Sequence, residues 1–179
     1  EDNEFSAFER SLCEAGVSAH QVCGVMTETY QGGNSSFAPT SYIQQLRQWC
    51  NDHKALLIMD EVQAGFGRTG TFWGFEHYGI QPDLIACGKG ISGSLPISAV
   101  IGRSHIMDLF PPGSMTSTHS GNPVCCAAAL ASLKLILAEN LPERASRIGS
   151  VLQDSSQRIQ RRFSDVILAS HGKGLVTSL

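Results

Sequence analysis

An excess of charge of one sign is missing from this chain of 179 residues. Lys and Arg number 13 against 16 Asp and Glu, which gives a formal net charge of −3. Proteins that bind nucleic acids or anionic membranes usually carry an excess of basic residues. The balance therefore argues against both partners, and we expect this protein to bind neither nucleic acid nor a membrane.

Long hydrophobic runs and a basic leader are also missing. No apolar stretch approaches the roughly 18 residues of a membrane-spanning helix. The first four residues, Glu1–Glu4, contain neither an initiator Met nor the basic segment that opens a signal peptide. We expect a truncated or processed N-terminus and no secretion.

Cysteines with the spacing of metal ligands or of a disulfide framework are absent too. Four of the six cysteines stand alone, and Cys125 and Cys126 are adjacent in an Ala-rich stretch. The six histidines are equally scattered. This use of cysteine is typical of small apolar residues in a reducing cytoplasm, and we expect no metal.

The elements that the sequence does show alternate between helical and strand character. We expect helices near 5–12, 40–50, 123–139 and from 143 onward, and strands at 22–27, 55–59, 84–87, 97–101, 166–169 and 174–179. The apolar run 55–59 is typical of a strand buried on both faces. The alternation predicts an α/β fold with a mostly parallel sheet flanked by helices. A shift in composition near 140–142 suggests a boundary between 1–139 and 140–179.

Three charged residues directly follow predicted strands: Glu28, Asp60 and Lys89. Sheets of this class bind ligands at the carboxyl ends of their strands. Each residue alone is better explained as a turn or surface residue. Together they suit a cofactor with a ring nitrogen, held protonated by Asp60, and an aldehyde that condenses with Lys89. Val62, two residues after Asp60, points to the same side if the extended backbone continues.

Five motifs, in this order, carry a family resemblance. They are TETYQG at 27–32, LIMDEVQAGFGRTG at 57–70, PDLIACGKG at 82–90, STHSGNP at 117–123 and GKGL at 172–175. The set resembles class III aminotransferases, which depend on pyridoxal 5'-phosphate and have fold type I.

The resemblance implies specific roles for the residues around the cofactor. Lys89 corresponds to the lysine that holds the cofactor as an internal aldimine and moves the proton, and Asp60 to the partner of the pyridine nitrogen. Val62 corresponds to the residue that packs on the ring, and Gln63 to one near its phenolic oxygen. No metal is implied.

Two further residues are implied to complete the site. Thr118 corresponds to a residue that binds the cofactor phosphate of a neighbouring subunit, so a homodimer with shared active sites is expected. Glu28 corresponds to an acidic residue near the substrate pocket. His119 stands where the family more often has Phe or Tyr.

The resemblance also implies that this is the central part of a longer protein. Residues 1–139 correspond to a cofactor-binding large domain that is incomplete at its N-terminus, and 140–179 to the beginning of a small C-terminal α+β domain. Family members are more than twice this long. Their small-residue phosphate cup, ring-stacking aromatic residue and carboxylate-binding arginine lie outside these 179 residues.

The implied activity is transfer of an amino group from an amine or amino acid to a 2-oxo acid by a ping-pong mechanism. Three alternatives stay open at this point. They are a mutase, epimerase or decarboxylase of the same superfamily, a degenerate non-catalytic subunit, and a non-catalytic fragment. A flavodoxin-like nucleotide binder is disfavoured, since no Gly-rich phosphate turn follows the first strand.

Overall fold

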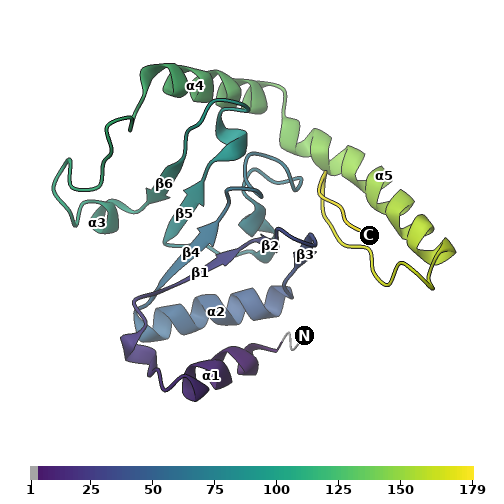
Figure 1. Ribbon diagram of the computed structural model, residues 1–179, viewed down its shortest axis with the longest axis horizontal. Helices are drawn as coiled ribbons and strands as arrows, with labels where there is room; N and C mark the ends of the chain where they lie inside the picture. Colours follow the sequence, from purple (N-terminus) through teal and green to yellow (C-terminus); the bar gives the residue numbers. More distant parts are fainter. Residues whose placement is uncertain (1–3) are drawn as a thin grey trace.

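The computed structural model describes residues 4–179. The helices are α1 (Phe5–Glu14), α2 (Thr40–His53), α3 (Ser104–Met107), α4 (Pro123–Ala138) and α5 (Leu141–Arg162), with short 3-10 turns η1 (Ala19–Gln21), η2 (Gly74–Tyr78) and η3 (Lys89–Ile91) (Figure 1). The strands are β1 (Gly24–Glu28), β2 (Tyr30–Gln31), β3 (Ser36–Phe37), β4 (Leu56–Asp60), β5 (Leu84–Cys87) and β6 (Ala99–Gly102).

The central sheet has the order β1-β4-β5-β6. Strands β1, β4 and β5 run parallel, and β6 pairs antiparallel with β5. The prediction of a mostly parallel α/β sheet with flanking helices is confirmed. The last strand begins two residues later than the predicted range 97–101, after Pro96.

Helix α2 covers one face of the sheet. Its buried residues Ile43, Leu46, Trp49 and Cys50 join the apolar core formed with β4 and β5. Helix α1 packs outside α2, where the Phe8 and Trp49 rings meet edge to face with centroids 5.0 Å apart. Two helical layers therefore lie on this side of the sheet (Figure 1).

The opposite face of β4 is less well covered. Leu57 and Met59 are fully buried toward the helical layers, whereas Leu56 and Ile58 are half-buried. The prediction that this strand is buried on both faces is therefore wrong. A continuous apolar run does not by itself supply a covering layer on each side.

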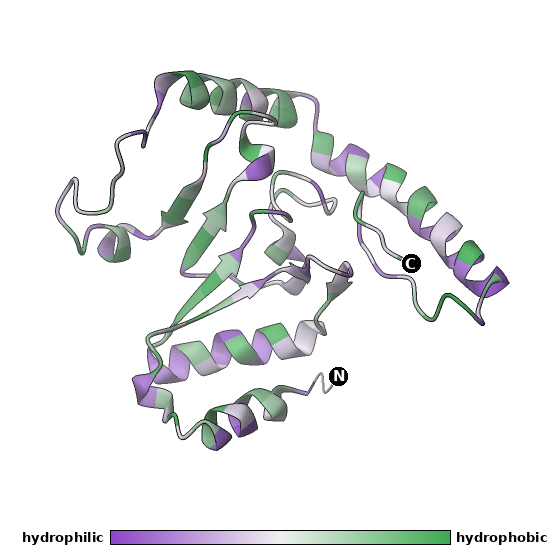
Figure 2. Ribbon diagram, viewed as in Figure 1, coloured by the Kyte–Doolittle hydropathy of each residue, from purple (hydrophilic) through white to green (hydrophobic). Residues whose placement is uncertain are grey.

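Helix α4 begins as the sequence predicts. The Asn122 side-chain oxygen accepts hydrogen bonds from the backbone N–H groups of Val124 (3.0 Å) and Cys125 (3.2 Å), and Pro123 occupies the first turn. The helix is apolar on nearly all sides (Figure 2). Only Ala129 and Ile136 are buried.

The two strands predicted at 166–169 and 174–179 do not form. The chain makes turns after α5 and then runs back with a single bridge between His171 and Ser178. Instead of joining a sheet, it docks through its backbone: the Leu175 N–H donates to the Arg68 carbonyl (3.0 Å). Strand-forming residues without a neighbouring edge have no partner for their backbone hydrogen bonds.

Helices α4 and α5 meet at Asn140, whose φ of +46° lies in the left-handed region. The turn falls at the predicted boundary, and the division into 1–139 and 140–179 stays a prediction.

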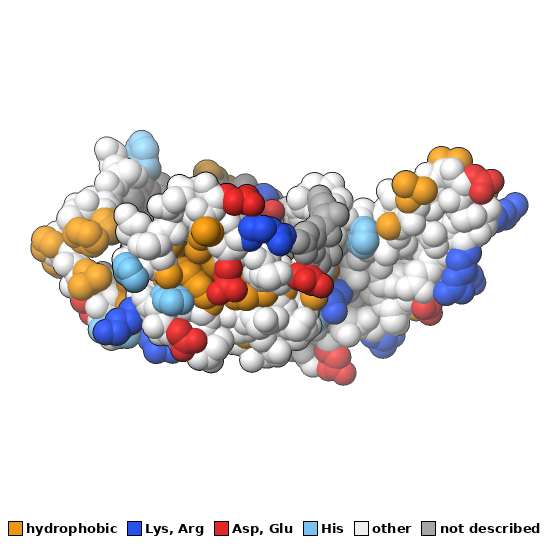
Figure 3. All heavy atoms as spheres, turned by 90° about the horizontal axis from the view of Figure 1, so that it is seen from below, with side chains coloured by type: hydrophobic (Ala, Val, Ile, Leu, Met, Phe, Trp, Pro, Cys, Tyr) orange, Lys and Arg blue, Asp and Glu red, His pale blue; other side chains and the backbone are white. Residues whose placement is uncertain are grey.

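Within residues 4–179 no single helix is both long enough and apolar enough to cross a membrane. Helices α4 and α5 reach the required length and apolarity only when taken together, and they are bent by 66° relative to each other. On the face seen in Figure 3, basic and acidic side chains are intermingled rather than separated by sign.

Candidate active site

The carboxyl ends of three parallel strands bring the predicted residues to one edge of the sheet. Glu28 at the end of β1 is the register partner of Asp60 at the end of β4, and Asp60 is the partner of Ala86 in β5. Lys89 follows Ala86 by three residues and opens η3. Neighbouring strands lie about 4.8 Å apart, so the three segments converge here.

Lys89 has an unusual backbone. Its φ of +40° lies in the left-handed region, which costs free energy for a residue with a side chain. Such strain persists only where the surroundings impose it and is concentrated at functional sites. A Cβ on the preceding Gly88 would lie 3.7 Å from Val62 Cγ1, so Val62 packs closely beside the segment that carries Lys89.

Asp60 folds the chain back after β4. One of its carboxylate oxygens, Oδ1, accepts a hydrogen bond from the Val62 N–H at 2.9 Å, and residues 62–69 continue as turns. This side-chain turn is a common way for Asp to end an extended segment. The extended geometry does not persist to Val62, so the condition for placing Val62 by strand alternation is not met, and Val62 is placed by the turn.

Gln63 and Glu28 meet around Gly32. A Cβ at Gly32 would lie 2.7 Å from Gln63 Oε1 and 3.0 Å from Glu28 Oε1, and the Gly32 N–H donates to Glu28 Oε2 at 3.2 Å. A larger residue at position 32 would require the ends of these two flexible side chains to shift. The structure thus brings Glu28 and Gln63 together although they lie 35 positions apart in sequence.

A cleft of about 840 Å³ opens beside these residues. Its lining includes Lys89, Val62 and Gln63 together with the apolar side chains of Phe66 and Ile148. Cavities of this size accept small organic molecules. Glu28 and Asp60 stand outside the lining, so the structure separates the predicted residues into a set that faces the cleft and a set at the strand ends.

Thr118 lies apart from this cleft. It belongs to the exposed segment 111–121, between α3 and α4, and none of these residues lines the cleft. Within residues 4–179, Thr118 therefore does not join Lys89. No three His, Cys, Asp or Glu side chains in that range are grouped as a metal site would require.

Sequence reasoning missed a buried carboxylate at Glu61. Its side chain is fully buried and accepts hydrogen bonds from the backbone N–H groups of Gly74 (2.7 Å) and Phe75 (2.9 Å) and from the Thr29 hydroxyl. Burial raises the pKa of Glu61 despite these three donors. Continuing the inward alternation of Leu57 and Met59 by one step would have placed Glu61 in the core.

The Glu61 contacts hold neighbouring strand ends together. The Glu61 N–H donates to the Ala86 carbonyl at 2.8 Å, which links the ends of β4 and β5. Through Thr29 the same residue links the end of β1, and the Tyr78 hydroxyl donates to the Thr29 carbonyl at 2.5 Å. Glu61 thus supports the segments that carry Asp60, Glu28 and Lys89.

Comparison with known proteins matches this arrangement to one family. A model of class III aminotransferases matches residues 2–179. The chain belongs to the class III aminotransferase family. It is 40% identical over 153 residues to an acetylornithine aminotransferase of Methanopyrus kandleri, a match that covers 85% of this chain and 38% of that relative. The chain therefore spans about two fifths of the length of the relatives it matches.

Solved structures of a transaminase and of an ornithine aminotransferase share the fold. An S-selective transaminase from Arthrobacter sp. superimposes with a TM-score of 0.87 and 36% identity, covering 97% of this chain and 38% of that one. An ornithine aminotransferase from Toxoplasma gondii, described with partial occupancy of pyridoxal phosphate at its active site, gives a TM-score of 0.84 and 32% identity over 99% of this chain and 41% of that one. Class III aminotransferases depend on pyridoxal phosphate.

The residues at the sheet edge fit that cofactor. The Lys89 side chain is exposed at the cleft, and Val62 offers an apolar surface in the same lining. The second carboxylate oxygen of Asp60, Oδ2, has no hydrogen-bond partner among residues 4–179. An amine, an apolar surface and a carboxylate oxygen are the groups that an aldehyde-bearing, protonated heteroaromatic ring requires.

Proposed function

We propose that the complete protein is a pyridoxal-phosphate-dependent aminotransferase that moves an amino group from an amine or amino acid to a 2-oxo acid. The observation that carries the proposal is the placement of the strained Lys89 in one cleft with Val62 and Gln63, directly beside the end of the strand that carries Asp60. Membership of the class III family supports the same reaction.

When bound, pyridoxal phosphate supplies an aldehyde that condenses with amines to a Schiff base and a protonated ring that accepts electrons. Lys89 would be the amine that anchors the cofactor, and it would also take and return the substrate proton. Asp60 would hold the proton on the ring nitrogen, and Val62 would offer an apolar surface to the ring. Gln63 would hydrogen-bond to the phenolic oxygen through its side-chain amide, and Glu28 would lie near the substrate pocket.

A homodimer with shared active sites is part of the proposal. Thr118 is exposed and lies outside the cleft of its own chain, which fits contact with the cofactor phosphate of a second subunit. We also propose a cytoplasmic location, supported by six cysteines that are all free thiols. Amino donor and 2-oxo acid are the small-molecule partners.

The test is covalent trapping of the cofactor in the complete protein. Incubation with pyridoxal phosphate, reduction with borohydride and peptide mass mapping should place the pyridoxyl group on Lys89. Lys89→Ala should abolish the label, whereas the control Lys134→Ala, on the exposed side of α4, should retain it. A label on Lys54, Lys134 or Lys173 instead would remove the proposal.

A further inference from the structure

Two residues with strained backbones, Phe66 and Lys89, come from neighbouring segments of the cleft lining. Phe66 has a φ of +61° and Lys89 a φ of +40°, both in the left-handed region that bulky side chains rarely adopt. A Cβ on Gly90 would lie 3.4 Å from both Cβ and Cδ2 of Phe66, which is van der Waals contact. The Phe66 side chain therefore lies directly against the backbone that follows Lys89.

We propose that Phe66 is a positioning residue for Lys89, an inference that rests on the proposed function. Its ring supports the turn 88–91 from the side of the cleft and keeps the Lys89 backbone in the conformation that places the lysine side chain in the cleft lining. A phenyl ring has no proton to transfer, so Phe66 acts through the lysine and not on the reacting atoms. A misplacement of about 1 Å costs a reacting group about a hundredfold in rate.

Backbone hydrogen bonds on both sides impose the strained conformation of Phe66. The Gly65 N–H donates to the Glu61 carbonyl at 3.0 Å, and the Gly67 N–H donates to the Phe72 carbonyl at 3.1 Å. Strained residues persist only where the surroundings over-determine them, and they are concentrated at functional sites. The backbone of Phe66 is therefore set by its neighbours, and so is the direction of its ring.

An aromatic cluster packs against the Phe66 ring. The centroid of this ring lies 5.1 Å from that of Trp73 and 5.9 Å from that of Phe72, and the Phe72 and Trp73 rings meet edge to face at 5.2 Å. Aromatic pairs at such distances are stabilising beyond the apolar area that they bury. A Cβ on Gly65 would lie 3.0 Å from the Trp73 ring, so Trp73 also packs on the backbone just before Phe66. The ring that contacts Gly90 is thus part of a packed unit.

The turn that carries Lys89 is supported from helix α4 as well. Buried Ile91 and Ala129 belong to one apolar cluster, and Phe66 packs against that cluster. The Ile91 N–H donates to the Gly88 carbonyl at 3.1 Å, which closes the turn. Removal of the Phe66 ring takes away the support on the cleft side, so the Lys89 backbone gains room to relax toward the right-handed region.

The rate of covalent attachment of pyridoxal phosphate measures how well Lys89 is placed. The complete protein is freed of cofactor and mixed with increasing pyridoxal phosphate, and absorbance follows the reaction in which the Lys89 amine adds to the aldehyde carbon and water leaves. The half-saturating concentration reports binding before the reaction, and the limiting rate reports the placement of the amine. Phe66→Gly should lower the limiting rate by about tenfold to a hundredfold and leave the half-saturating concentration unchanged.

The choice of variants separates the ring from the backbone. Glycine adopts a φ of +61° without strain, so Phe66→Gly loses the ring while the loop still folds. Phe66→Leu should recover part of the limiting rate, because an apolar side chain again contacts the turn. Phe72→Leu is the matched control, since it removes a ring of the same cluster that lies outside the cleft lining. Lys54→Gly places a glycine at another left-handed position, with a φ of +58°. Both controls should attach the cofactor at the wild-type rate.

Three results would overturn the assignment. An equal loss of limiting rate in either control would mean a general loosening of the protein. A raised half-saturating concentration with an unchanged limiting rate would assign Phe66 to direct contact with the cofactor. Hydrogen exchange of the peptide 88–92 without cofactor should be faster in Phe66→Gly, and unchanged exchange would show that the turn does not depend on the ring. Failure of the proposed function is distinguishable as a missing pyridoxyl label on wild-type Lys89, and hydrogen exchange then decides alone whether Phe66 supports the turn.

Discussion

Glu61 and Gly74 are joined by a 2.7 Å hydrogen bond in which the Gly74 N–H donates to the buried carboxylate. The bond closes the loop that follows β4 onto η2. A Cβ at Gly74 would lie 2.8 Å from Thr29 Cγ2 and 2.9 Å from Ala64 Cβ, so no larger residue fits. The strand end that carries Asp60 is therefore held by a carboxylate one residue further along.

The first prediction concerns the pH dependence of stability that Glu61 causes. Burial raises its pKa above the ordinary value of 4.5, so folding favours the protonated form. Its contribution to the free energy of unfolding is complete below pH 4.5 and is lost as the pH rises through the raised value. Urea unfolding across this range should show a shallower pH dependence for Glu61→Gln. The exposed Glu9→Gln should follow the wild type, and an equal change there would contradict the assignment to Glu61.

Alternation of elements and the Asn122–Pro123 cap were readable from the sequence because both are local signals. The buried Glu61 was not, because its donors at Thr29 and at Gly74 lie 32 and 13 residues away. The predicted strand at 166–169 fails for a related reason. Strand propensity says nothing about whether a sheet edge is available, and Leu168 is 87% exposed.

The cleft was equally hidden from sequence reasoning. Tyr30, Arg68 and Arg144 come from three distant segments, and only the packing of α5 on the glycine-containing loop 67–70 brings them to one cavity. Tyr30 and Arg68 belong to the motifs on which the family resemblance rests, but the sequence predicted no role for either residue. The order of strand ends, by contrast, placed Glu28, Asp60 and Lys89 at one sheet edge because parallel strands share their polarity.

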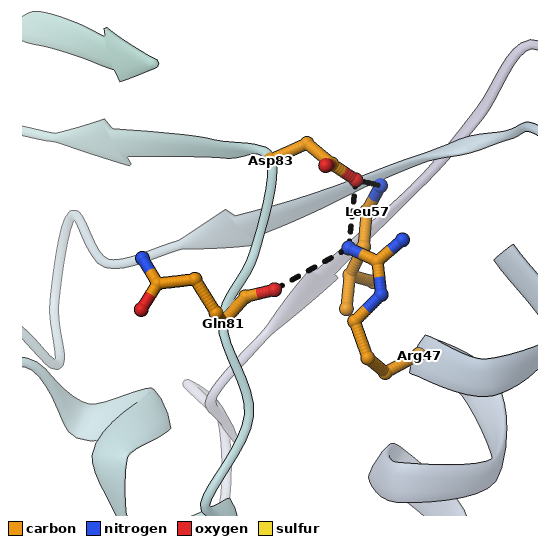
Figure 4. A network of polar contacts seen from close by, with 4 residues as sticks. All are labelled: Arg47, Leu57, Gln81 and Asp83. Atoms are coloured by element: carbon orange, nitrogen blue, oxygen red, sulfur yellow. Dashed lines mark hydrogen bonds and ion pairs between the residues drawn. The ribbon is translucent and has the colours of Figure 1, made fainter. Parts of the chain in front are cut away.

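The second prediction concerns the ion pair between Arg47 on α2 and Asp83 before β5 (Figure 4). The same carboxylate oxygen accepts the Leu57 N–H at 2.8 Å, and both side chains are mostly buried. Arg47→Met should lower the free energy of unfolding by about 3 kcal/mol at neutral pH, because it leaves a buried carboxylate without its cation. Chemical unfolding measures the loss, and Gln48→Met on the exposed side of α2 is the control.

We expect the difference in free energy of unfolding between the wild type and Arg47→Met to become smaller at acid pH. Burial alone would raise the pKa of Asp83, but the Leu57 hydrogen bond and Arg47 outweigh it and hold the pKa below 3.8. The stabilisation is therefore present above pH 3.8 and is lost as the pH falls through the lowered value. A difference between wild type and Arg47→Met that stays constant down to complete protonation would show that the guanidinium acts only through packing.

The third prediction concerns the contact between α5 and the C-terminal segment that contains Gly174. A Cβ at Gly149 would lie 2.4 Å from the Gly174 carbonyl oxygen, a backbone atom that cannot move aside alone. Gly149→Ala should therefore destabilise the protein by about 1–3 kcal/mol, although alanine favours helices elsewhere. Thermal unfolding checks this, and Ser150→Ala at the exposed neighbouring position should change the melting temperature little. A stabilised Gly149→Ala variant would mean that the segment does not dock on α5.

The fourth prediction concerns Asp60. Asp60→Asn should still form the turn, because the amide oxygen accepts the Val62 N–H as the carboxylate does. The neutral amide does not stabilise a positive charge on the ring nitrogen, so amino transfer should slow by about 100- to 1,000-fold. Single-turnover absorbance of the cofactor-loaded protein measures the rate. If the variant reacted at the wild-type rate, Asp60 would act only in the turn and not on the cofactor ring.

The fifth prediction concerns the sharing of sites between subunits. Thr118 lies outside the cleft that holds Lys89 in its own chain, and we propose that it reaches the cofactor of a second copy. Thr118→Ala and Lys89→Ala homodimers should each be impaired. Co-expression with two different affinity tags yields heterodimers, in which one of the two sites has both an intact Lys89 and an intact Thr118 from the partner. These heterodimers should regain up to about half of the wild-type activity per dimer, because one site of two is complete. Purified heterodimers that stay as inactive as the Lys89→Ala homodimer would place the action of Thr118 within its own chain and would contradict the shared site.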